Sequence, residues 1–271
     1  MPMNRFAFSS VLAACIVLCP AKTTNAKLAG NTLAPEKLTS NGPAASTLAA
    51  SSLTVEQLGP NEYVVNPEAA AALLSTEDGR EVLSFIVSCA LPESVTVTAT
   101  APDGAVYQFF GDIGLASEWL EHPLREAGRG WVSACLFARV NAHGVAQAFS
   151  MRGQNKALAT TAEELATFTL EEGAFYGDYF ATPGSAVPIA CRGEDQASGE
   201  FGGLVSRDCA EPDAADATHT LCGFRYAGDC GDFAPEPACK HFAPHDFYRK
   251  CQDRASGAKP VGEVITVFVL P

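Results

Sequence analysis

Cysteine constrains the fold of this chain more than any other residue type. Eight of its ten cysteines follow residue 88, and six of these lie between residues 191 and 251. An even number of closely spaced cysteines is typical of a disulfide framework in an oxidising compartment. We therefore expect four disulfides, although eight cysteines allow on the order of 100 pairings, so the connectivity stays open. The candidates are Cys89, Cys135, Cys191, Cys209, Cys222, Cys230, Cys239 and Cys251.

The N-terminus indicates that the chain is exported. Arg5 precedes an uncharged, mostly apolar run from Phe6 to Leu18, which is too short to span a bilayer but fits the core of a signal peptide. We therefore predict a signal peptide at residues 1–26. The alternative is a lipobox at residues 12–15, which would leave Cys15 as a lipid-anchored N-terminus. Against this alternative, the apolar run continues beyond Cys15.

Charge excludes one class of partner. Of the 18 basic residues in the chain, Arg5 and Lys22 lie in the predicted signal peptide, so 16 remain against 31 acidic residues. A chain this acidic is not expected to bind nucleic acid, whose phosphates require a basic surface. No other apolar run is long enough to cross a membrane. The expected partner is an extracytoplasmic ligand or protein of unknown identity.

Leucine recurs every fifth residue between residues 27 and 60, where Pro43 occupies the one missing position. A period of five fits neither a helix nor a strand. The segment resembles the pentapeptide-repeat families, in which a central Leu or Phe points into a right-handed β-helix. The alternative interpretation is a flexible linker rich in Ala, Ser and Thr. The leucines are Leu28, Leu33, Leu38, Leu48, Leu53 and Leu58.

The folded region is predicted to span residues 61–271 as a single α+β domain. Its N-terminal half is expected to be helical, with helix starts capped at Asn66 and at residues 75–76, and a helix that Pro92 ends. Its C-terminal half is expected to consist of short strands and loops joined by disulfides.

Four further elements are predicted within this domain. An alternating run at 94–100 and an apolar, aromatic run at 105–110, separated by a Pro-Asp-Gly turn, predict a hairpin, and a second helix is expected over 130–141. Thr161–Glu164 has the form of a capping box. The apolar run at 263–270 predicts a central strand buried on both faces.

The predicted elements favour particular cysteine pairs. Cys89 and Cys135 each lie on the apolar face of a predicted helix, so a disulfide could join the two helices if these pack together; two buried thiols are the alternative. Farther along, Cys222 with Cys230 and Cys239 with Cys251 are close enough in sequence to form local pairs.

One group of residues has metal-like chemistry. Cys230, Cys239, His241 and His245 could form a tetrahedral zinc site. The paired Cys-x-x-Cys of zinc fingers is missing, Pro244 interrupts any helix that would carry both histidines, and an oxidising compartment favours disulfides. We therefore keep zinc as a weak alternative and expect no cofactor.

No catalytic motif is present in the sequence, since a Gly-x-Ser-x-Gly elbow is absent. Glu171 and Glu172 could in principle serve a glycosidase, but neighbouring residues on a strand point to opposite faces. The following aromatic stretch supplies Tyr176, Tyr179 and Phe180, which could form a ligand-binding face or ordinary sheet core. Whether the protein is an enzyme stays open, and the pattern favours a non-catalytic protein.

Several blocks resemble segments of uncharacterised exported bacterial proteins, in which a five-residue repeat precedes a Cys-rich domain. This resemblance implies no known activity. We expect a secreted or surface-exposed, disulfide-stabilised binding or structural protein of unknown ligand; the alternative is a secreted hydrolase whose site is assembled from residues distant in sequence. The blocks lie at residues 79–81, 88–92, 131–135, 172–177 and 226–230.

Overall fold

The structure is a computed structural model that describes part of the chain. The predicted signal peptide, Cys15 and His245 lie outside the described residues, as do the predictions made for them, and the side chains of residues 28–30 are also outside. The described residues are 28–142, 146–181, 188–195, 207, 209, 219–231, 237–243, 246–253, 257 and 259–271.

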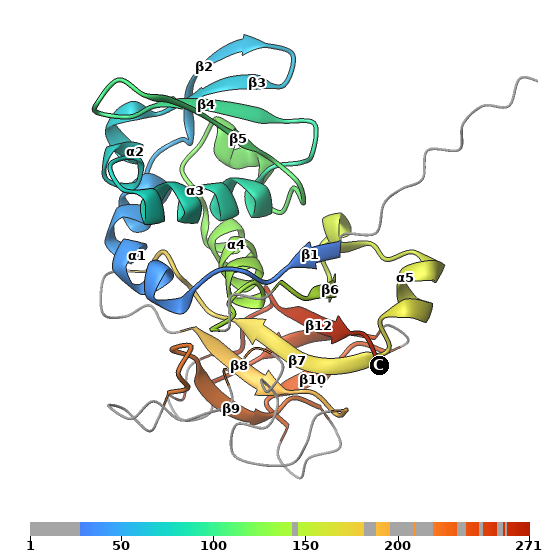
Figure 1. The fold of residues 1–271 in the computed structure, drawn as a ribbon. Helices are drawn as coiled ribbons and strands as arrows, with labels where there is room; N and C mark the ends of the chain where they lie inside the picture. Colours follow the sequence, from blue (N-terminus) through green and yellow to red (C-terminus); the bar gives the residue numbers. More distant parts are fainter. Residues whose placement is uncertain are drawn as a thin grey trace, which may run out of the picture.

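The described residues form an α+β fold, as predicted. Helices separate a four-stranded sheet from a six-stranded sheet, and a two-stranded hairpin lies beyond the larger sheet (Figure 1). Helices α2 and α3 contact the small sheet, while α4 contacts β7 and β12 of the large sheet. One continuous apolar core runs from Leu33 to Val267 through both sheets and the helices between them. Within the described residues, no helix is both long and apolar enough to cross a bilayer.

The helical layer begins where the capping residues predict. The Asn66 side chain accepts a hydrogen bond from the Ala69 backbone N–H at 3.3 Å, and the Thr76 hydroxyl accepts one from Gly79 at 3.0 Å. Leu91 is extended because it precedes Pro92, and this ends the amphipathic helix. The helices are α1 (Pro35–Ala49), α2 (Pro67–Leu74), α3 (Glu77–Ala90), α4 (Glu126–Ala138) and α5 (Ala162–Thr167), with two 3₁₀ helices, η1 (Ser117–Leu120) and η2 (Lys156–Leu158).

The small sheet has the strand order β2-β3-β4-β5. The predicted hairpin is present as β4 and β5, which pair antiparallel across Pro102–Gly104. Strands β3 and β4 pair in parallel, so α2 and α3 form the crossover that parallel pairing requires. The strands are β2 (Thr54–Gly59), β3 (Glu62–Val65), β4 (Thr96–Thr100) and β5 (Val106–Phe110).

The leucine-rich segment is part of this fold, so both interpretations made from its period of five are wrong for residues 35–49. These residues form α1, which buries Leu38, Ala45 and Leu48 against the core. Residues ten positions apart lie about 80° apart around a helix, so Leu38 and Leu48 fall on one face. Asn41 and Ala45 complete that face, and the periodicity of the leucines alone therefore conceals the helical pattern. The folded domain accordingly begins before residue 61.

The large sheet has the order β1-β6-β12-β7-β8-β9. The C-terminal run forms β12, a buried central strand between β6 and β7, as predicted. All neighbours pair antiparallel except β8 and β9. The bounds are β1 (Leu28–Gly30), β6 (Ala148–Arg152), β7 (Leu170–Tyr176), β8 (Ile189–Arg192), β9 (Arg225–Asp229) and β12 (Ile265–Val269), with the separate hairpin strands β10 (Cys239–His241) and β11 (Tyr248–Cys251).

Four disulfides join these elements. The predicted bridge between Cys89 and Cys135 ties α3 to α4, with a Cα–Cα distance of 6.0 Å, and the predicted Cys239–Cys251 bridge closes the hairpin. The predicted pairing of Cys222 with Cys230 is wrong. Cys230 bonds to Cys191 because β9 and β8 are neighbouring strands, and Cys222 bonds to Cys209.

Candidate functional site

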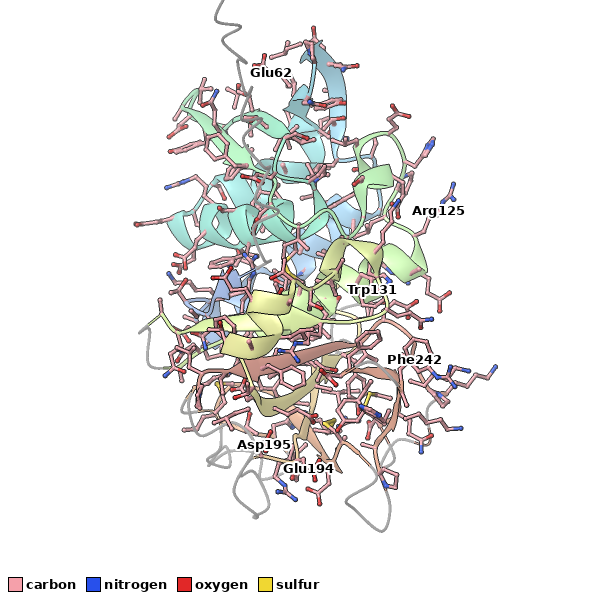
Figure 2. All side chains as sticks on the ribbon, turned by 90° about the vertical axis from the view of Figure 1, so that its right-hand side faces the viewer. Glu62, Arg125, Trp131, Glu194, Asp195 and Phe242 are labelled. Carbon is pink, nitrogen blue, oxygen red and sulfur yellow. A yellow bond between two sulfur atoms is a disulfide. The ribbon has the colours of Figure 1, made fainter. Side chains whose placement is uncertain are left out.

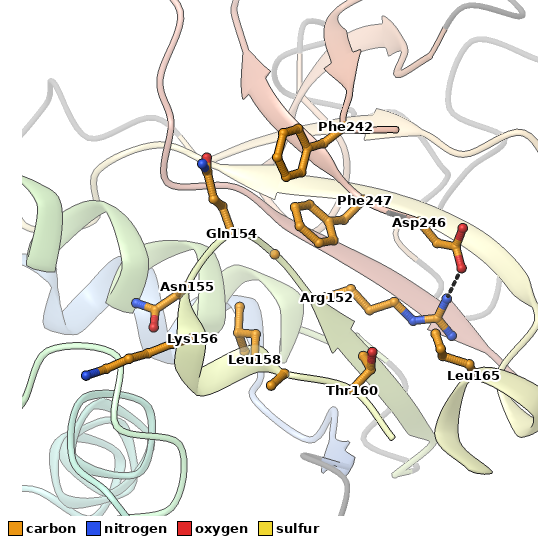
Figure 3. A pocket seen from close by; sticks show the side chains of 12 residues that line it. Arg152, Gln154, Asn155, Lys156, Leu158, Thr160, Leu165, Phe242, Asp246 and Phe247 are labelled. Atoms are coloured by element: carbon orange, nitrogen blue, oxygen red, sulfur yellow. Dashed lines mark ion pairs between the residues drawn. The ribbon is translucent and has the colours of Figure 1, made fainter. Parts of the chain in front are cut away.

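The pocket that we consider the candidate site lies at the outer edge of the large sheet. Its volume is about 430 Å³, within the range of ligand-binding pockets. Its lining comes from three places: Arg152 at the end of β6 with the turn that follows it, Leu165 on α5, and Phe242, Asp246 and Phe247 between β10 and β11. Figure 3 shows the rings of Phe242 and Phe247 facing this space, with Gln154 on the opposite side.

The turn after β6 is fixed by close packing. A Cβ atom at Gly153 would lie 2.8 Å from the backbone oxygen of Val264, so only glycine lets the two backbones approach this closely. Asn155 caps η2, since its side chain accepts a hydrogen bond from Ala157 at 2.9 Å. This turn places the amide of Gln154 and the hydroxyl of Thr160 at the rim of the pocket.

Arg152 forms the base of the pocket and is fully engaged. Its guanidinium donates to the hydroxyl of Ser150 at 3.1 Å and to the backbone oxygen of Phe168 at 2.5 Å, and it forms an ion pair with Asp246 at 3.6 Å. Burial lowers the pKa of Arg152, and the nearby carboxylates oppose that shift. A guanidinium stays protonated in proteins, so Arg152 holds its positive charge beneath the pocket.

The capping box of α5 extends this network. The side chain of Glu164 accepts hydrogen bonds from the backbone of Thr161 at 3.4 Å and from the hydroxyl of Ser150 at 2.6 Å. The predicted capping box is therefore confirmed, and it joins α5 to β6. These contacts fix one wall of the pocket.

The aromatic wall is carried by the hairpin. The backbone N–H of Phe242 donates to the oxygen of Phe247 at 3.0 Å, and their ring centroids are 5.5 Å apart. The next residue, Tyr248, anchors the loop: its N–H donates to the hydroxyl of Thr266 at 3.0 Å, and its own hydroxyl donates to Glu171 at 2.7 Å. Burial raises the pKa of Glu171, and the hydrogen bond from Tyr248 opposes that shift.

Glu171 and Glu172 do not share a site. Glu172 is buried and forms an ion pair with Arg207 at 2.6 Å, whereas Glu171 bonds to Tyr248 on the other side of β7. The strand is bulged here, since Val267 and Phe268 pair with Gly173 and Glu171. The prediction that the two carboxylates point to opposite faces is confirmed despite the bulge.

The predicted aromatic face is wrong as a binding surface. Tyr176, Tyr179 and Phe180 are at most 5 % exposed. The hydroxyl of Tyr176 donates to the backbone oxygen of Gln252 at 3.0 Å, and that of Tyr179 donates to Leu38 at 2.9 Å. The alternative interpretation as sheet core is the correct one.

The predicted zinc set is not assembled. Cys230 and Cys239 are each bonded in a disulfide, so neither offers a thiolate, and His241 lies on the exposed face of the hairpin. The sulfur atoms of Cys191, Cys230 and Cys239 nevertheless lie within 4.8 Å of one another. In reduced form these three thiolates could hold a soft metal ion; as disulfides they form a structural cluster behind the hairpin.

Comparison with known proteins adds no assignment, because no family model, curated protein or solved structure matches the chain. The assignment of this pocket as the candidate site therefore depends on its geometry alone. The sequence reasoning missed Phe242 and Phe247, whose signal was two aromatic residues flanking a short polar loop inside the Cys-rich region.

Proposed function

We propose that the protein is an exported, disulfide-stabilised binding protein that takes a saccharide in the pocket beside Phe242 and Phe247. The observation that carries the proposal is the composition of this pocket. Two phenylalanine rings form one wall, and the amide of Gln154 and the hydroxyl of Thr160 also line the pocket. Apolar sugar faces pack on aromatic rings, while sugar hydroxyls require neutral donors and acceptors.

The charged residues of the pocket support binding rather than catalysis. The ion pair between Arg152 and Asp246 engages two of them with each other, and further hydrogen bonds hold the Arg152 guanidinium in place. The framework is also suited to export, since disulfides persist in oxidising compartments. A pre-formed wall needs little ordering when the ligand binds.

The test uses neutral oligosaccharides, first as an array and then by titration calorimetry with the ligands that bind. Burying a phenylalanine ring contributes about 1.5–3 kcal/mol, so Phe247→Ala is expected to weaken binding at least about tenfold. Phe110→Ala is the matched control, because Phe110 is 61 % exposed on the small sheet. Absence of binding, or equal loss in both variants, would refute the proposal.

A hydrolase is the second candidate, and one observation favours it. The raised pKa of Glu171 is a property of general acids, and its carboxylate accepts a hydrogen bond from Tyr248, the residue that follows Phe247 of the aromatic wall. Broad glycosidase, esterase and peptidase screens on the oxidised protein test it. Turnover that Glu171→Gln abolishes would establish the hydrolase and replace the binding proposal.

A further inference from the structure

A second cavity lies along the strands of the same hairpin. Its volume is about 830 Å³, and it lies between β10, β11 and residues 259–260. We call it the basic groove, because five basic side chains line it and none of its described lining residues is acidic. These side chains are Lys240, His241, Arg249, Lys250 and Lys259.

The charge of this region is opposite to that of the rest of the molecule. Residues 237–260 hold five of the 18 Lys and Arg residues of the chain and only two of its 31 acidic residues. One of those two, Asp253, is buried in an ion pair with Arg225. The other, Asp246, pairs with Arg152 in the neighbouring pocket. Neither acid is therefore placed to neutralise the groove.

The two central lysines are held side by side. Lys240 and Lys250 are directly opposite each other in the β10–β11 register, next to the pair formed by Cys239 and Cys251. The disulfide fixes the two strands, so the lysine side chains leave from neighbouring, fixed positions. Like charges directly opposite on a sheet are destabilising. Among the ion pairs of the described residues, none involves Lys240, Lys250 or Lys259.

We propose that the basic groove binds a polysaccharide chain that carries sulfate or carboxylate groups. An anionic group between Lys240 and Lys250 would turn their repulsion into two favourable contacts. Arg249 reaches from the groove to Phe242, with its guanidinium carbon 5.0 Å from the ring centroid. Stacking on this ring holds the Arg249 guanidinium in place, so a third positive charge lines the groove beside the two lysines.

The shape of the groove and the predicted export of the chain favour this ligand over other polyanions. A membrane surface is flat, whereas these cations line a concave groove. Nucleic acid is the competing polyanion, and an exported chain is expected to meet polysaccharide rather than nucleic acid. Figure 2 shows nitrogen-ended side chains beside Phe242, while Glu194 and Asp195 lie farther along the same layer.

The experiment measures binding of the intact oxidised protein to heparin oligosaccharides, which carry sulfate, and to oligogalacturonate, which carries carboxylate. Binding of either is expected, and the anion that binds identifies the group. Lys240→Gln with Lys250→Gln is expected to weaken it at least tenfold. Arg125→Gln removes the same kind of charge from an exposed site on the helical layer and is expected to change binding less than twofold. Added salt is expected to weaken binding of the wild type.

A stability measurement separates binding from a structural role. Lys250→Glu removes the repulsion across the hairpin, so it should leave the thermal midpoint unchanged or higher while it abolishes binding. The proposal fails if neither anionic glycan binds, if Arg125→Gln weakens binding as much as the double variant, or if single-stranded DNA binds more tightly. This inference does not depend on the saccharide pocket: Phe247→Ala should retain the anionic ligand, and the double lysine variant should retain the neutral one.

Discussion

Arg152 and Tyr248 fix the two walls of the pocket by contacts that the sequence does not reveal. Arg152 is held from β6 and by the carbonyl of Phe168, while Tyr248 is held by Thr266 and Glu171. Arg152 is held by residues near it in the sequence, whereas Tyr248 bonds to Glu171, which is 77 residues away. The aromatic wall could therefore be located only by knowing how the hairpin packs on the large sheet.

The contribution of Glu171 to the stability of the protein is expected to depend on pH. Because burial raises its pKa, the folded protein holds this proton more tightly than the unfolded chain does. The resulting stabilisation is fully present below the unfolded pKa, near 4.5, and is lost as the pH rises through the folded value. Glu171→Gln resembles the protonated form at every pH. We therefore expect the unfolding free energy of the wild type to fall relative to the variant as the pH rises from about 4.

Urea unfolding of both proteins across this pH range measures the difference. Comparing the two removes the contributions of other buried carboxyls, such as Asp178, whose pKa is also raised by burial. A difference that is constant with pH, or one that grows in favour of the wild type, would contradict the assignment of Glu171.

Local sequence signals were sufficient to predict some of the helices and strands but not others. Caps at Asn66, Thr76 and Thr161 marked helix starts correctly, because a side chain that satisfies a free N–H acts locally. The hairpin of β4 and β5 and the central strand β12 were also predicted correctly from the sequence. Helix α1 was not, because alanine and asparagine supply three of the five residues that it buries. Whether such a segment forms a helix is decided by its packing against residues distant in sequence, which the sequence pattern does not show.

Two helical glycines provide a matched prediction at this scale. A Cβ at Gly79 would lie 2.2 Å from the backbone oxygen of Leu73, because α2 and α3 approach closely there. At Gly42 in α1 the nearest contact would be 3.8 Å, to Tyr179. Alanine is favoured over glycine in helices by about 1 kcal/mol, but Pro43 follows Gly42 and disfavours helical backbone for a preceding residue that has a Cβ. We expect Gly42→Ala to change the unfolding free energy by less than about 1 kcal/mol and Gly79→Ala to lower it by more than that.

Denaturant unfolding of both variants checks this pair. The same substitution is made in both, so helix propensity alone would shift both in the same direction. If both variants gain stability, α2 and α3 do not approach as closely as described.

The four disulfides are distributed unequally along the chain. One bridge, Cys89–Cys135, closes the core between α3 and α4, and three lie in the C-terminal part, where apolar packing is thinner. Two of those three adjoin the hairpin, with the sulfur atoms of Cys191 and Cys239 3.4 Å apart. Disulfides therefore add to the hydrogen bonds that hold the surface we assign to ligands. If a disulfide stabilises by restricting the unfolded chain, each bridge that closes a loop of this length contributes about 3–4 kcal/mol to the free energy of unfolding.

For the whole molecule, the sequence indicated that disulfides form but not which strands lie side by side. The even cysteine count predicted four bridges, and two of the proposed pairs were correct. Cys230 was assigned to the wrong partner because its true partner, Cys191, is near only once β8 and β9 lie side by side. The pocket was likewise out of reach, since it combines the hairpin with residues 152–165, which are distant from it in sequence.

The most direct test of this account is a disulfide map of the native protein, obtained by alkylating free thiols and sequencing cross-linked peptides by mass spectrometry without reduction. The account predicts no labelled thiol among the eight cysteines and four linked pairs, Cys89–Cys135, Cys191–Cys230, Cys209–Cys222 and Cys239–Cys251. A Cys222–Cys230 link, or thiols at Cys191, Cys230 and Cys239 that react only after chelation, would contradict it and indicate a metal centre or a different framework behind the hairpin.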